Sequence, residues 1–475
     1  MKKITCLIVL LFTLNSCGTD YFYSSFTIRR ELLWFTSLAD QETLDTHAQM
    51  VGYTPTLNRF SSPSIIATPA NYLVAIYENR NISGSDLDIY GINGNKKVEV
   101  TARISKNSSN FDNTVTVGNI KNLNPSSAHG SPVSFLTKEG DIVVLSTAGV
   151  GFAKDGVATE KTKIAVSIST DNGYNWTDWK DLDETVFESL KAYNRFYTTP
   201  GNGKTLRNGT LVCMIDYKTN YEEKARGAAI LYSADNGKTW KIGGTLTYNG
   251  NTHRFAKIIA ERTDGKLLIA AVSYTGTNDI ATYNNTGSIA WYLADDLNSP
   301  INTFNVTGPE IIDANLVVVK VFERNSGGVI SGDRIKYAYK GRAYDGILLA
   351  HSYPERKFQH QSGQQTVSNV TAISISGDDG KTWTMITNVV GKDESTNQAA
   401  FRHSGLAVFK DGSIGLAYEE GIGPSINDRQ GFIPYYRRFG LSAISGGKYR
   451  YEGLWLIIKV WYYKLSFLFL TRSSN

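Results

Sequence analysis

Carboxylates and arginines at the ends of strand-like runs are the residues of this sequence whose chemistry could serve catalysis. Arg80 ends the run NYLVAIYENR, Asp86 follows six residues later in NISGSD, and Glu419 and Glu420 end the run SIGLAYEE. Two carboxyl groups that lie close together can supply a general acid and a general base. Arginine binds acidic groups through charge-assisted, partly bidentate hydrogen bonds. Such chemistry requires elements that bring the two halves of the chain to one place.

The element that recurs along the chain is an eight-residue turn. It reads STDNGYNW at Ser169–Trp176, SADNGKTW at Ser233–Trp240 and SGDDGKTW at Ser376–Trp383, and a fainter copy, SKNSSNF, occupies Ser105–Phe111. The three clear copies each follow a strand-like run. Their aspartate can accept hydrogen bonds from nearby backbone N–H groups, and their glycine adopts a positive φ at low cost. This is the Asp-box of β-hairpin turns.

The spacing of the Asp-boxes indicates the architecture. The serines of the first three copies are 64 residues apart, and the last copy begins 143 residues later, a little over two such periods. That gap leaves room for a blade without a box. About 60 residues make one four-stranded blade with its loops, so the region from about Thr54 to Gly440 holds six blades. The sequence therefore predicts an all-β, six-bladed β-propeller. We interpret Asp171, Asp235 and Asp378 as structural residues of its turns, with the closing tryptophans buried against the neighbouring sheets.

The N-terminus has the pattern of an export signal. Lys2 and Lys3 precede an apolar run from Ile4 to Leu14, which is too short to span a bilayer but suits a cleaved signal. The tetrapeptide LNSC that ends at Cys17 resembles a bacterial lipobox, which predicts cleavage and acylation at that cysteine. An ordinary signal peptide cut nearby is the alternative. Either way we expect an exported protein, and as a lipoprotein it would be anchored in the membrane, at the bacterial cell surface or in the periplasm.

Composition excludes several other classes of protein. Cys6 falls in the signal and Cys17 in the lipobox, which leaves Cys213 alone and rules out a disulfide framework or a metal-ligand spacing. The net charge of +5 becomes +3 without Lys2 and Lys3, and acids and bases are interspersed, so there is no basic stripe for nucleic acid. No metal or cofactor is implied.

The chain divides into four segments: a signal (1–17), a tether and lead-in segment (18–53), the propeller (54–447) and an apolar C-terminal tail (448–475). The tail contains LWLIIKVWYYKLSFLFL, from Leu454 to Leu470, with Lys459 and Lys464 inside it. It makes a poor membrane span because it is short and twice charged. We favour a final strand that closes the ring, or a tail translated from a disrupted reading frame.

Asp-boxes in a six-bladed propeller on an exported chain resemble the exo-sialidase family of glycoside hydrolases, over most of the region from Thr54 to Gly440. Four segments sharpen the resemblance: RFSSPSII (Arg59–Ile66) is similar to the family's Phe/Tyr-Arg-Ile-Pro start, NYLVAIYENR to its strand ending in arginine, TDGKLLIA (Thr263–Ala270) to the strand after the catalytic glutamate, and HSGLAVFKDGSIGLAYEEG (His403–Gly421) to the nucleophile strand and the strand that follows it.

The resemblance implies the release of terminal sialic acids from sialylated glycans, including those of mucin-type glycoproteins. In that family three arginines bind the substrate carboxylate, a tyrosine assisted by a glutamate is the nucleophile, and an aspartate is the general acid. Carried over to this sequence, the resemblance implies substrate binding by Arg80, a general acid at Asp86 with Asp88 as the alternative, and a supporting glutamate at Glu419.

Four positions at which the family has core residues carry other residues here: Ser61 for the first triad arginine, Ala256 for the catalytic glutamate, Val272 for the second triad arginine and His403 for the tyrosine. VSNVTAIS, before the last Asp-box, holds no third arginine. Because residues two apart share a strand face, Arg59 and Arg254 lie on the faces of Ser61 and Ala256, about 7 Å along the strand. With Arg356 from a loop, they can build a basic pocket for an acidic sugar. His403 is a candidate nucleophile or base, or else a hydrogen-bonding residue of the pocket.

Three hypotheses follow. The first is an exported sialidase-family hydrolase that uses Asp86 as general acid. The second is a catalytically degenerate, lectin-like propeller that binds sialylated or other acidic glycans. The third is an inverting hydrolase that pairs Asp86 with Glu419 or Glu420. We take the first as the family assignment, and we expect no standard tyrosine-nucleophile cycle because the nucleophile and its base are both replaced.

Overall fold

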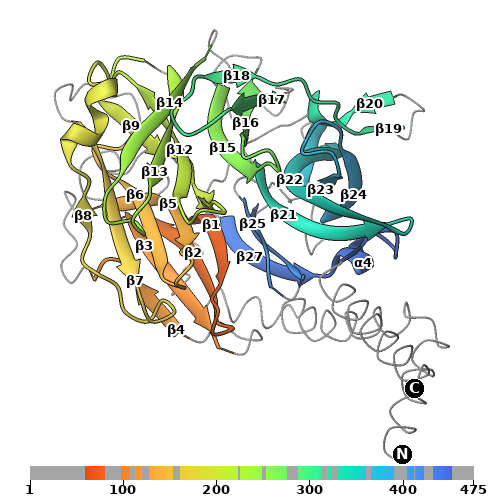
Figure 1. The fold of residues 1–475 in the computed structure, drawn as a ribbon, viewed down its shortest axis with the longest axis horizontal. Coiled ribbons are helices and arrows are strands. Elements are labelled where there is room, and N and C mark those ends of the chain that lie inside the picture. Colours follow the sequence, from red (N-terminus) through yellow and green to blue (C-terminus); the bar gives the residue numbers. More distant parts are fainter. Residues whose placement is uncertain are drawn as a thin grey trace, which may run out of the picture.

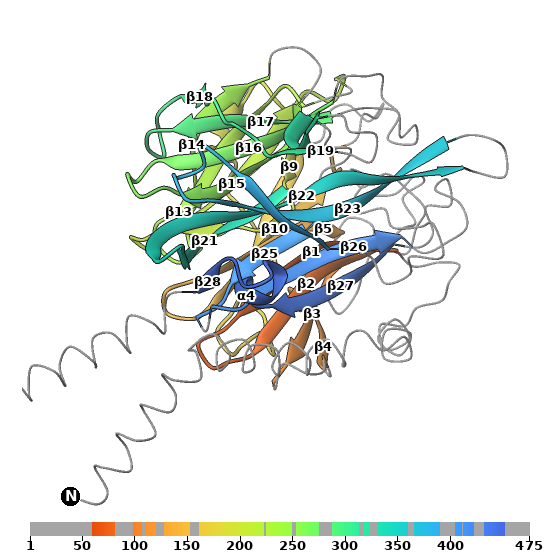
Figure 2. The same ribbon diagram turned by 90° about the vertical axis from the view of Figure 1, so that its right-hand side faces the viewer.

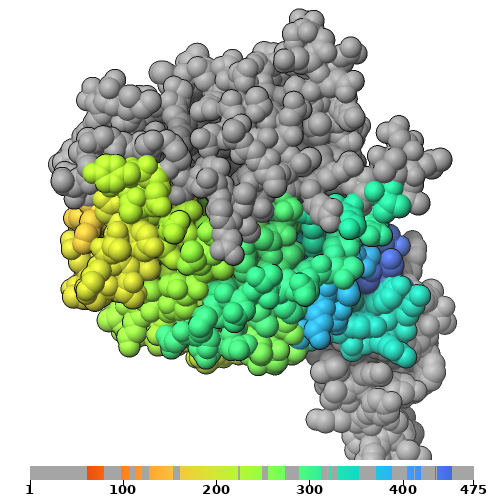
Figure 3. Space-filling view, turned by 90° about the horizontal axis from the view of Figure 1, so that it is seen from above, coloured from red at the N-terminus to blue at the C-terminus, as the bar shows by residue number. Residues whose placement is uncertain are grey.

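The structure, a computed structural model, covers most of the region expected to form blades. The described residues are 59–80, 98–106, 111, 113–119, 128–152, 161–222, 225–248, 253–274, 287–312, 318–323, 330–359, 365–389, 404–410, 412–421 and 432–451. Their strands form six blades around a central axis (Figure 1), which confirms the predicted all-β, six-bladed propeller. The blades follow one another in sequence order along the described surface in Figure 3.

The first two blades each contain an antiparallel meander that runs from the axis to the rim. Blade 1 consists of β1 (Arg59–Ala67), β2 (Leu73–Arg80), β3 (Val98–Ser105) and β4 (Asn113–Thr116), and blade 2 contains β5 (His129–Leu136), β6 (Ile142–Gly149), β7 (Thr162–Ser169) and β8 (Lys180–Asp181). The 3-10 helix η2 (Glu184–Leu190) follows blade 2. Its N-terminus is capped by Asp183, whose Oδ1 accepts the N–H of Thr185 at 2.9 Å.

The inner edge of blade 3 is broken into short pieces. These are β9 (Arg195–Thr198), β10 (Gly201–Asn202) and β11 (Lys204–Thr205), followed by β12 (Leu211–Lys218), β13 (Gly227–Ser233) and β14 (Lys241–Thr247). β9 and β11 pair with β12, whereas β10 crosses to blade 2 and pairs in parallel with β5. The side chain of Asn202 accepts the N–H of Ile65 at 3.2 Å and donates to its carbonyl at 2.7 Å, so β10 also ties blade 1 to this crossing.

The remaining blades complete the ring. Blade 4 consists of β15 (His253–Glu261), β16 (Leu267–Tyr274), β17 (Gly287–Ala294) and β18 (Ile301–Thr303), blade 5 contains β21 (Ile330–Tyr339), β22 (Arg342–Gln359), β23 (Gln365–Ser376) and β24 (Thr384–Val389), and blade 6 contains β25 (Ser404–Val408), β26 (Ile414–Gly421) and β27 (Phe432–Phe439). A separate pair, β19 (Glu310–Ile312) with β20 (Val318–Lys320), and the 3-10 helix η3 (Val321–Glu323) lie between blades 4 and 5 in sequence. After blade 6 come α4 (Leu441–Ile444) and β28 (Arg450–Tyr451), which pairs with β21.

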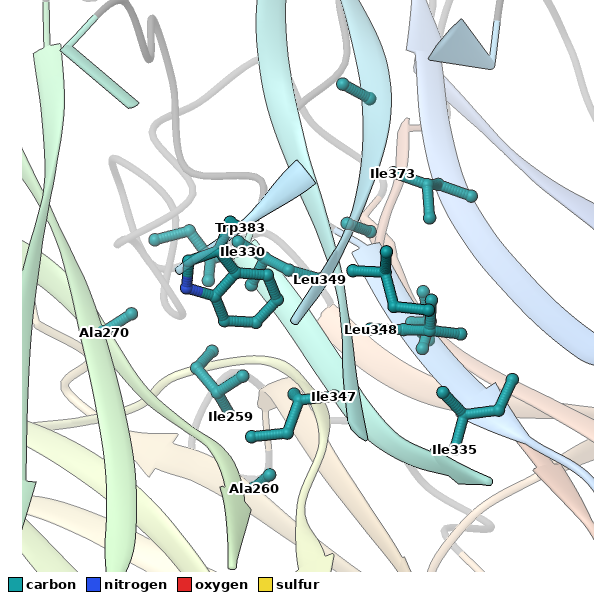
Figure 4. Close-up of a cluster of buried hydrophobic side chains, with 14 of the residues drawn as sticks. Ile259, Ala260, Ala270, Ile330, Ile335, Ile347, Leu348, Leu349, Ile373 and Trp383 are labelled. Carbon is teal, nitrogen blue, oxygen red and sulfur yellow. The ribbon is translucent and has the colours of Figure 1, made fainter. Parts of the chain in front are cut away.

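The second strand of a blade is covered on both faces by neighbouring blades, and its sequence is therefore apolar or small at nearly every position. β12, LVCMIDYK, is buried at all eight positions, and β6, IVVLSTAG, at the first seven. Large apolar clusters fill the spaces between blades. The one in Figure 4 joins Ile259 and Ala270 of blade 4 to Ile347 and Leu349 of blade 5, beside Trp383.

Blade 6 closes the ring against blade 1. An apolar cluster joins the two blades, and within it Phe111 and Tyr436 meet edge to face with ring centroids 5.6 Å apart. The backbones also approach closely, because a Cβ placed on Gly405 would lie 2.7 Å from the Cα of Ser64. This contact requires glycine in β25.

Each clear Asp-box holds its own turn. In the second box, Asp235 accepts hydrogen bonds from Ser233 Oγ (2.8 Å), the Thr239 N–H (2.8 Å) and Thr239 Oγ1 (2.6 Å). The indole of Trp240 donates to the carbonyl of Gly237 at 2.9 Å. The other two boxes, around Asp171 and Asp378, repeat this pattern.

Each box also presses on the blade before it. The glycine of the second box, Gly237, has φ +85°, and a Cβ added to it would lie 2.8 Å from Cγ1 of Val143 in blade 2. In the same way Gly173 approaches Val74 of blade 1. Trp383 of the third box stacks on Trp291 of blade 4, with ring centroids 5.4 Å apart. The boxes therefore join successive blades as well as closing hairpins.

β22 and β23 continue beyond their blade as a two-stranded ribbon. In the described pairing β22 stays beside β21 as far as His351, and β23 is beside β24 from Thr371 onward, whereas the β22–β23 ladder continues to the pair Gln359 and Gln365. Figure 2 shows this ribbon projecting past the other strands.

The signal sequence, Cys17, the lead-in segment and the apolar run Leu454–Leu470 lie outside the described residues. The described strands begin at Arg59 and reach Tyr451 in β28. Among the helices in the described ranges, none has the length and apolar character needed to cross a membrane.

Candidate functional site

Four of the residues expected in the site have described backbones, and these four lie at one end of the propeller, which we call the site end. There the inner strands begin and the second strands end. Arg59 pairs with Arg80, Arg254 with Val272, and Glu419 with Pro434. The opposite end carries the Asp-boxes and the turns between first and second strands, as shown by the N–H of Thr263 in the β15–β16 turn, which donates to Asp379 of the third box at 3.2 Å.

The structure describes these predicted residues to different extents. Arg59, Arg80, Arg254 and Glu419 are placed by their backbone, and the roles of their side chains stay predictions. Arg356 is placed in the β22–β23 ribbon, opposite Ser368. Asp86, Asp88 and His403 lie outside the described residues, although His403 directly precedes Ser404, the first residue of β25.

Ser61, which the sequence resemblance aligns with the first family arginine, is buried and bound to a carboxylate. It pairs with Glu78 across β1 and β2, and its hydroxyl donates to Oε1 of Glu78. The other carboxylate oxygen, Oε2, accepts the N–H of Ser131 in blade 2 at 2.7 Å. Sequence reasoning missed Glu78. The signal was its place two residues before Arg80 in the same strand, directly opposite Ser61.

A bulge recurs on the inner strands near the site end. The registers of β1, β5 and β15 shift just after Ser61, Gly130 and Arg254. The next residue in each strand has a positive φ: 62° at Ser62, 52° at Ser131 and 59° at Phe255. Arg254 therefore occupies in blade 4 the place that Ser61 occupies in blade 1.

The bulge corrects one expectation. Arg254 and Ala256 were expected to share a strand face because they are two residues apart. Regular alternation is required for that relation, and the left-handed Phe255 between them interrupts it. The corresponding relation between Arg59 and Ser61 lies in a regular stretch of the β1–β2 ladder.

A polar side chain on the second strand of one blade binds the inner strand of the next blade. Glu78 accepts the N–H of Ser131 at 2.7 Å, Oγ1 of Thr147 accepts the N–H of Thr198 at 2.9 Å, and Oδ2 of Asp216 accepts the N–H of Phe255 at 3.0 Å. We call these three contacts the blade latches.

The latch residues occupy equivalent positions. In each blade the reference position is the residue of the second strand that pairs with the last residue of the third strand. In blade 1 this is Leu73, which pairs with Ser105, and the latch residue lies five positions later. The same place is filled in the six blades, in order, by Glu78, Thr147, Asp216, Val272, Ser352 and Glu419. Glu419 thus belongs to a ring of repeated positions, a relation that its own sequence segment did not reveal.

Asp216 has a second partner. Its Oδ1 accepts the hydroxyl of Tyr248 at 3.0 Å, and both side chains are buried. Burial, reinforced by the negative charge of Asp216, raises the pKa of Tyr248 well above 10. Tyr248 is therefore a neutral hydrogen-bond donor at physiological pH and does not replace the missing phenolate nucleophile.

The crossing strand β10 lies where several inner strands meet. A Cβ on Gly201 would lie 2.9 Å from the carbonyl oxygen of Ser404 in blade 6 and 3.2 Å from Nζ of Lys257 in blade 4. Nearby, Ser134 Oγ donates to Ser64 Oγ at 2.7 Å. The hydroxyls of Ser131 and Ser404 are buried without a hydrogen-bond partner among the described residues.

The site end carries polar groups that can form hydrogen bonds. Hydroxyls, carboxylates and the backbone positions of three arginines gather at one end of the ring. No group of three or more histidine, cysteine, aspartate or glutamate side chains that could hold a metal ion occurs in the part of the chain that the structure describes.

Comparison with known proteins agrees with the fold. Residues 63–288 match the family model described as a BNR repeat-like domain. No curated protein matches the chain.

Solved sialidase structures share the fold at low sequence identity. A Hadza microbial sialidase is 17% identical, with a TM-score of 0.54 over 81% of this chain and 66% of that one. The intramolecular trans-sialidase of Ruminococcus gnavus is 15% identical, with a TM-score of 0.55 over 82% of this chain and 96% of that one. The sialidase of Trypanosoma rangeli, solved with sialic acid, is 13% identical, with a TM-score of 0.55 over 82% of this chain and 55% of that one.

The chain thus spans just under two thirds of the Hadza protein and about half of the Trypanosoma protein. Asp-box geometry, six blades and the BNR match agree with one another. Residues 63–288 match a BNR repeat-like domain, and the chain has a six-bladed β-propeller fold that it shares with solved sialidases.

Proposed function

We propose that this chain is an exported, sialidase-type glycoside hydrolase that recognises terminal sialic acids of glycoconjugates at the site end. The observation that supports the proposal is that the backbones of Arg59, Arg80 and Arg254 all lie at that end of the propeller. A sialic acid carries a carboxylate on its reacting carbon, and arginine is the side chain best suited to hold it.

Catalysis in this proposal depends on residues of the loops around the site end. Asp86, six residues beyond the end of β2, protonates the leaving oxygen, and His403, beside the start of β25, takes the nucleophilic or basic role. Export follows from the N-terminal signal, and acylation of Cys17 anchors the protein in the membrane. Replacement of Cys17 by alanine should abolish lipid labelling and release the exported protein into the soluble fraction.

A second candidate is a lectin-like protein that binds sialylated glycans without cleaving them. The specific observation that favours it is the pair Ser61 and Glu78. The resemblance aligns Ser61 with a family arginine, and a buried carboxylate beside Ser61 weakens attraction for a substrate carboxylate at that point. Turnover and binding therefore have to be measured separately.

The test uses the purified chain without residues 1–17. Hydrolysis of a fluorogenic aryl sialoside reports turnover, and calorimetry with free sialic acid reports binding. Arg80→Ala should weaken binding at least tenfold, whereas Arg342→Ala, an exposed arginine in β22 at the Asp-box end, should leave it unchanged.

The outcomes separate the two candidates. Turnover by the unmodified chain supports the hydrolase if Asp86→Ala slows it selectively. The loss should be much larger on substrates with poor leaving groups than on the activated aryl glycoside. Binding of sialic acid without turnover by the unmodified chain supports the lectin-like protein, whether or not His403→Tyr gains turnover. Absence of both turnover and binding refutes both candidates.

A further inference from the structure

The blade latch of Asp216 holds the bulge that follows Arg254. Phe255 is a bulky residue with φ 59°, a conformation that persists when its surroundings impose it. Asp216 Oδ2 accepts the N–H of Phe255 at 3.0 Å, and Oγ1 of Thr199 donates to the carbonyl of Ala256 at 2.8 Å. Blade 3 thus binds the bulge of blade 4 on both sides of the Phe255–Ala256 peptide bond.

The latch is itself held in place. The hydroxyl of Tyr248 donates to Oδ1 of Asp216 at 3.0 Å, so the two carboxylate oxygens have different partners. Asp216 and Tyr248 are 2% and 4% exposed. A buried carboxylate that is hydrogen-bonded at both oxygens is held in one orientation. Its hydrogen bond therefore restrains the backbone N–H that it binds.

The three blade latches differ in the residue that directly precedes the one whose N–H they bind. Glu78 holds Ser131, which follows Gly130, and Thr147 holds Thr198, which follows Tyr197. Asp216 holds Phe255, which follows Arg254. Of these three preceding residues, only Arg254 has a positively charged side chain.

We propose that Asp216 is a positioning residue for Arg254: blade 3 fixes the backbone from which blade 4 directs its arginine toward an acidic ligand. The proposal rests on the proposed function, because it takes Arg254 as an anchor for the carboxylate of sialic acid. Neither Asp216 nor Tyr248 touches the ligand in this arrangement.

The experiment compares variants that remove the latch with variants that keep it. Asp216→Leu removes both acceptors at similar size. Asp216→Asn keeps the latch, since the amide oxygen accepts from Phe255 and the amide nitrogen donates to the Tyr248 oxygen. Thr147→Val removes the equivalent latch of blade 2 and is the matched control. Binding of free sialic acid, the urea midpoint and amide hydrogen exchange at Phe255 are measured for each protein.

Asp216→Leu should weaken binding of sialic acid at least tenfold and speed amide exchange at Phe255, while Asp216→Asn stays within about threefold of the unmodified chain. Thr147→Val should lower the urea midpoint and leave affinity within about twofold. If Asp216→Leu does not fold, Tyr248→Phe removes one hydrogen bond from the latch and should weaken binding about threefold.

Two results would overturn the proposal without touching the proposed function. One is unchanged affinity in Asp216→Leu while Arg254→Ala loses binding. The other is an equal loss of affinity in Thr147→Val, which would make the latches purely structural. Unchanged affinity in Arg254→Ala refutes the proposed function at that residue, and exchange at Phe255 still decides whether Asp216 holds the bulge.

Discussion

Replacement of Asp235 by alanine should destabilise the propeller by an amount that depends on pH. The carboxylate accepts three hydrogen bonds, from Ser233 Oγ and from the N–H and Oγ1 of Thr239, at 2.6–2.8 Å. Buried hydrogen bonds to a charged group contribute about 1.5–3 kcal/mol each. Water reaches this turn and replaces part of that energy, so we expect a total loss of about 2 kcal/mol, the upper range for a capping carboxylate.

The pH dependence follows from the pKa of Asp235. Burial by itself would raise it, but the hydrogen bonds from the side chain and backbone of Thr239 outweigh burial and lower the pKa below 3.8. A lowered folded-state pKa means that the stabilisation is complete above the unfolded-state pKa, about 4, and is lost as pH falls through the folded-state pKa. The difference between the unmodified chain and Asp235→Ala, which has no carboxyl group to ionise, should therefore be largest at pH 6–7 and should shrink below about pH 4.

Urea unfolding followed by tryptophan fluorescence at pH 7 and at pH 3.5 measures this difference. Asp181→Asn is the control, because Asp181 forms a single 2.7 Å ion pair with Lys163 between side chains that are 45% and 59% exposed. Such a surface pair contributes at most about 1 kcal/mol. Equal effects of Asp235→Ala and Asp181→Asn, or a loss for Asp235→Ala that does not change with pH, would refute the assignment of this energy to the Asp-box carboxylate.

Three further perturbations test other parts of the fold. Gly237→Ala, at φ +85° and against the preceding blade, should cost at least about 1 kcal/mol more in urea unfolding than Gly265→Ala, at φ +86° with no atom within 4 Å of its Cβ; equal costs would show that the boxes do not press on their neighbours. Cys213 is buried and its thiol pKa is raised by burial, so a disulfide reagent at pH 8 should label it at the rate of unfolding, and rapid labelling of the native chain would contradict its placement. Asn202→Leu should lower stability by about 2 kcal/mol in the same urea assay, since β1 loses a donor and an acceptor, and an unchanged midpoint would exclude β10 as a tie between blades.

The architecture was predictable from the sequence because an Asp-box is a local signal. Ser233, Asp235, Gly237 and Trp240 lie within eight residues, and the turn that they form requires no distant partner beyond the neighbouring blade. Blade 4 lacks a box. Its turn is held by Asp296, which accepts the N–H groups of the residues two and three positions later at 2.7 and 2.8 Å.

The candidate site was less predictable because its geometry depends on contacts between blades. The alternation rule placed Arg254 with Ala256, but Phe255 between them has a positive φ, and its N–H binds Asp216 of another blade. Glu78 escaped notice for the same reason. Its partner Ser131 lies 53 residues away, and the strand that contains Glu78 reads as an ordinary buried run.

The separation between the two ends of the propeller has a consequence for how such a protein changes over generations. The hydrogen bonds of the Asp-boxes and the contacts of their glycines lie at one end, whereas Ser61 and the backbone of Arg254 lie at the other. A substitution at the site end alters ligand recognition, whereas the hydrogen bonds and packing contacts at the Asp-box end stay unchanged. The fold is therefore evolvable: its ligand specificity can drift through many amino-acid exchanges before the ring of blades loses its stability.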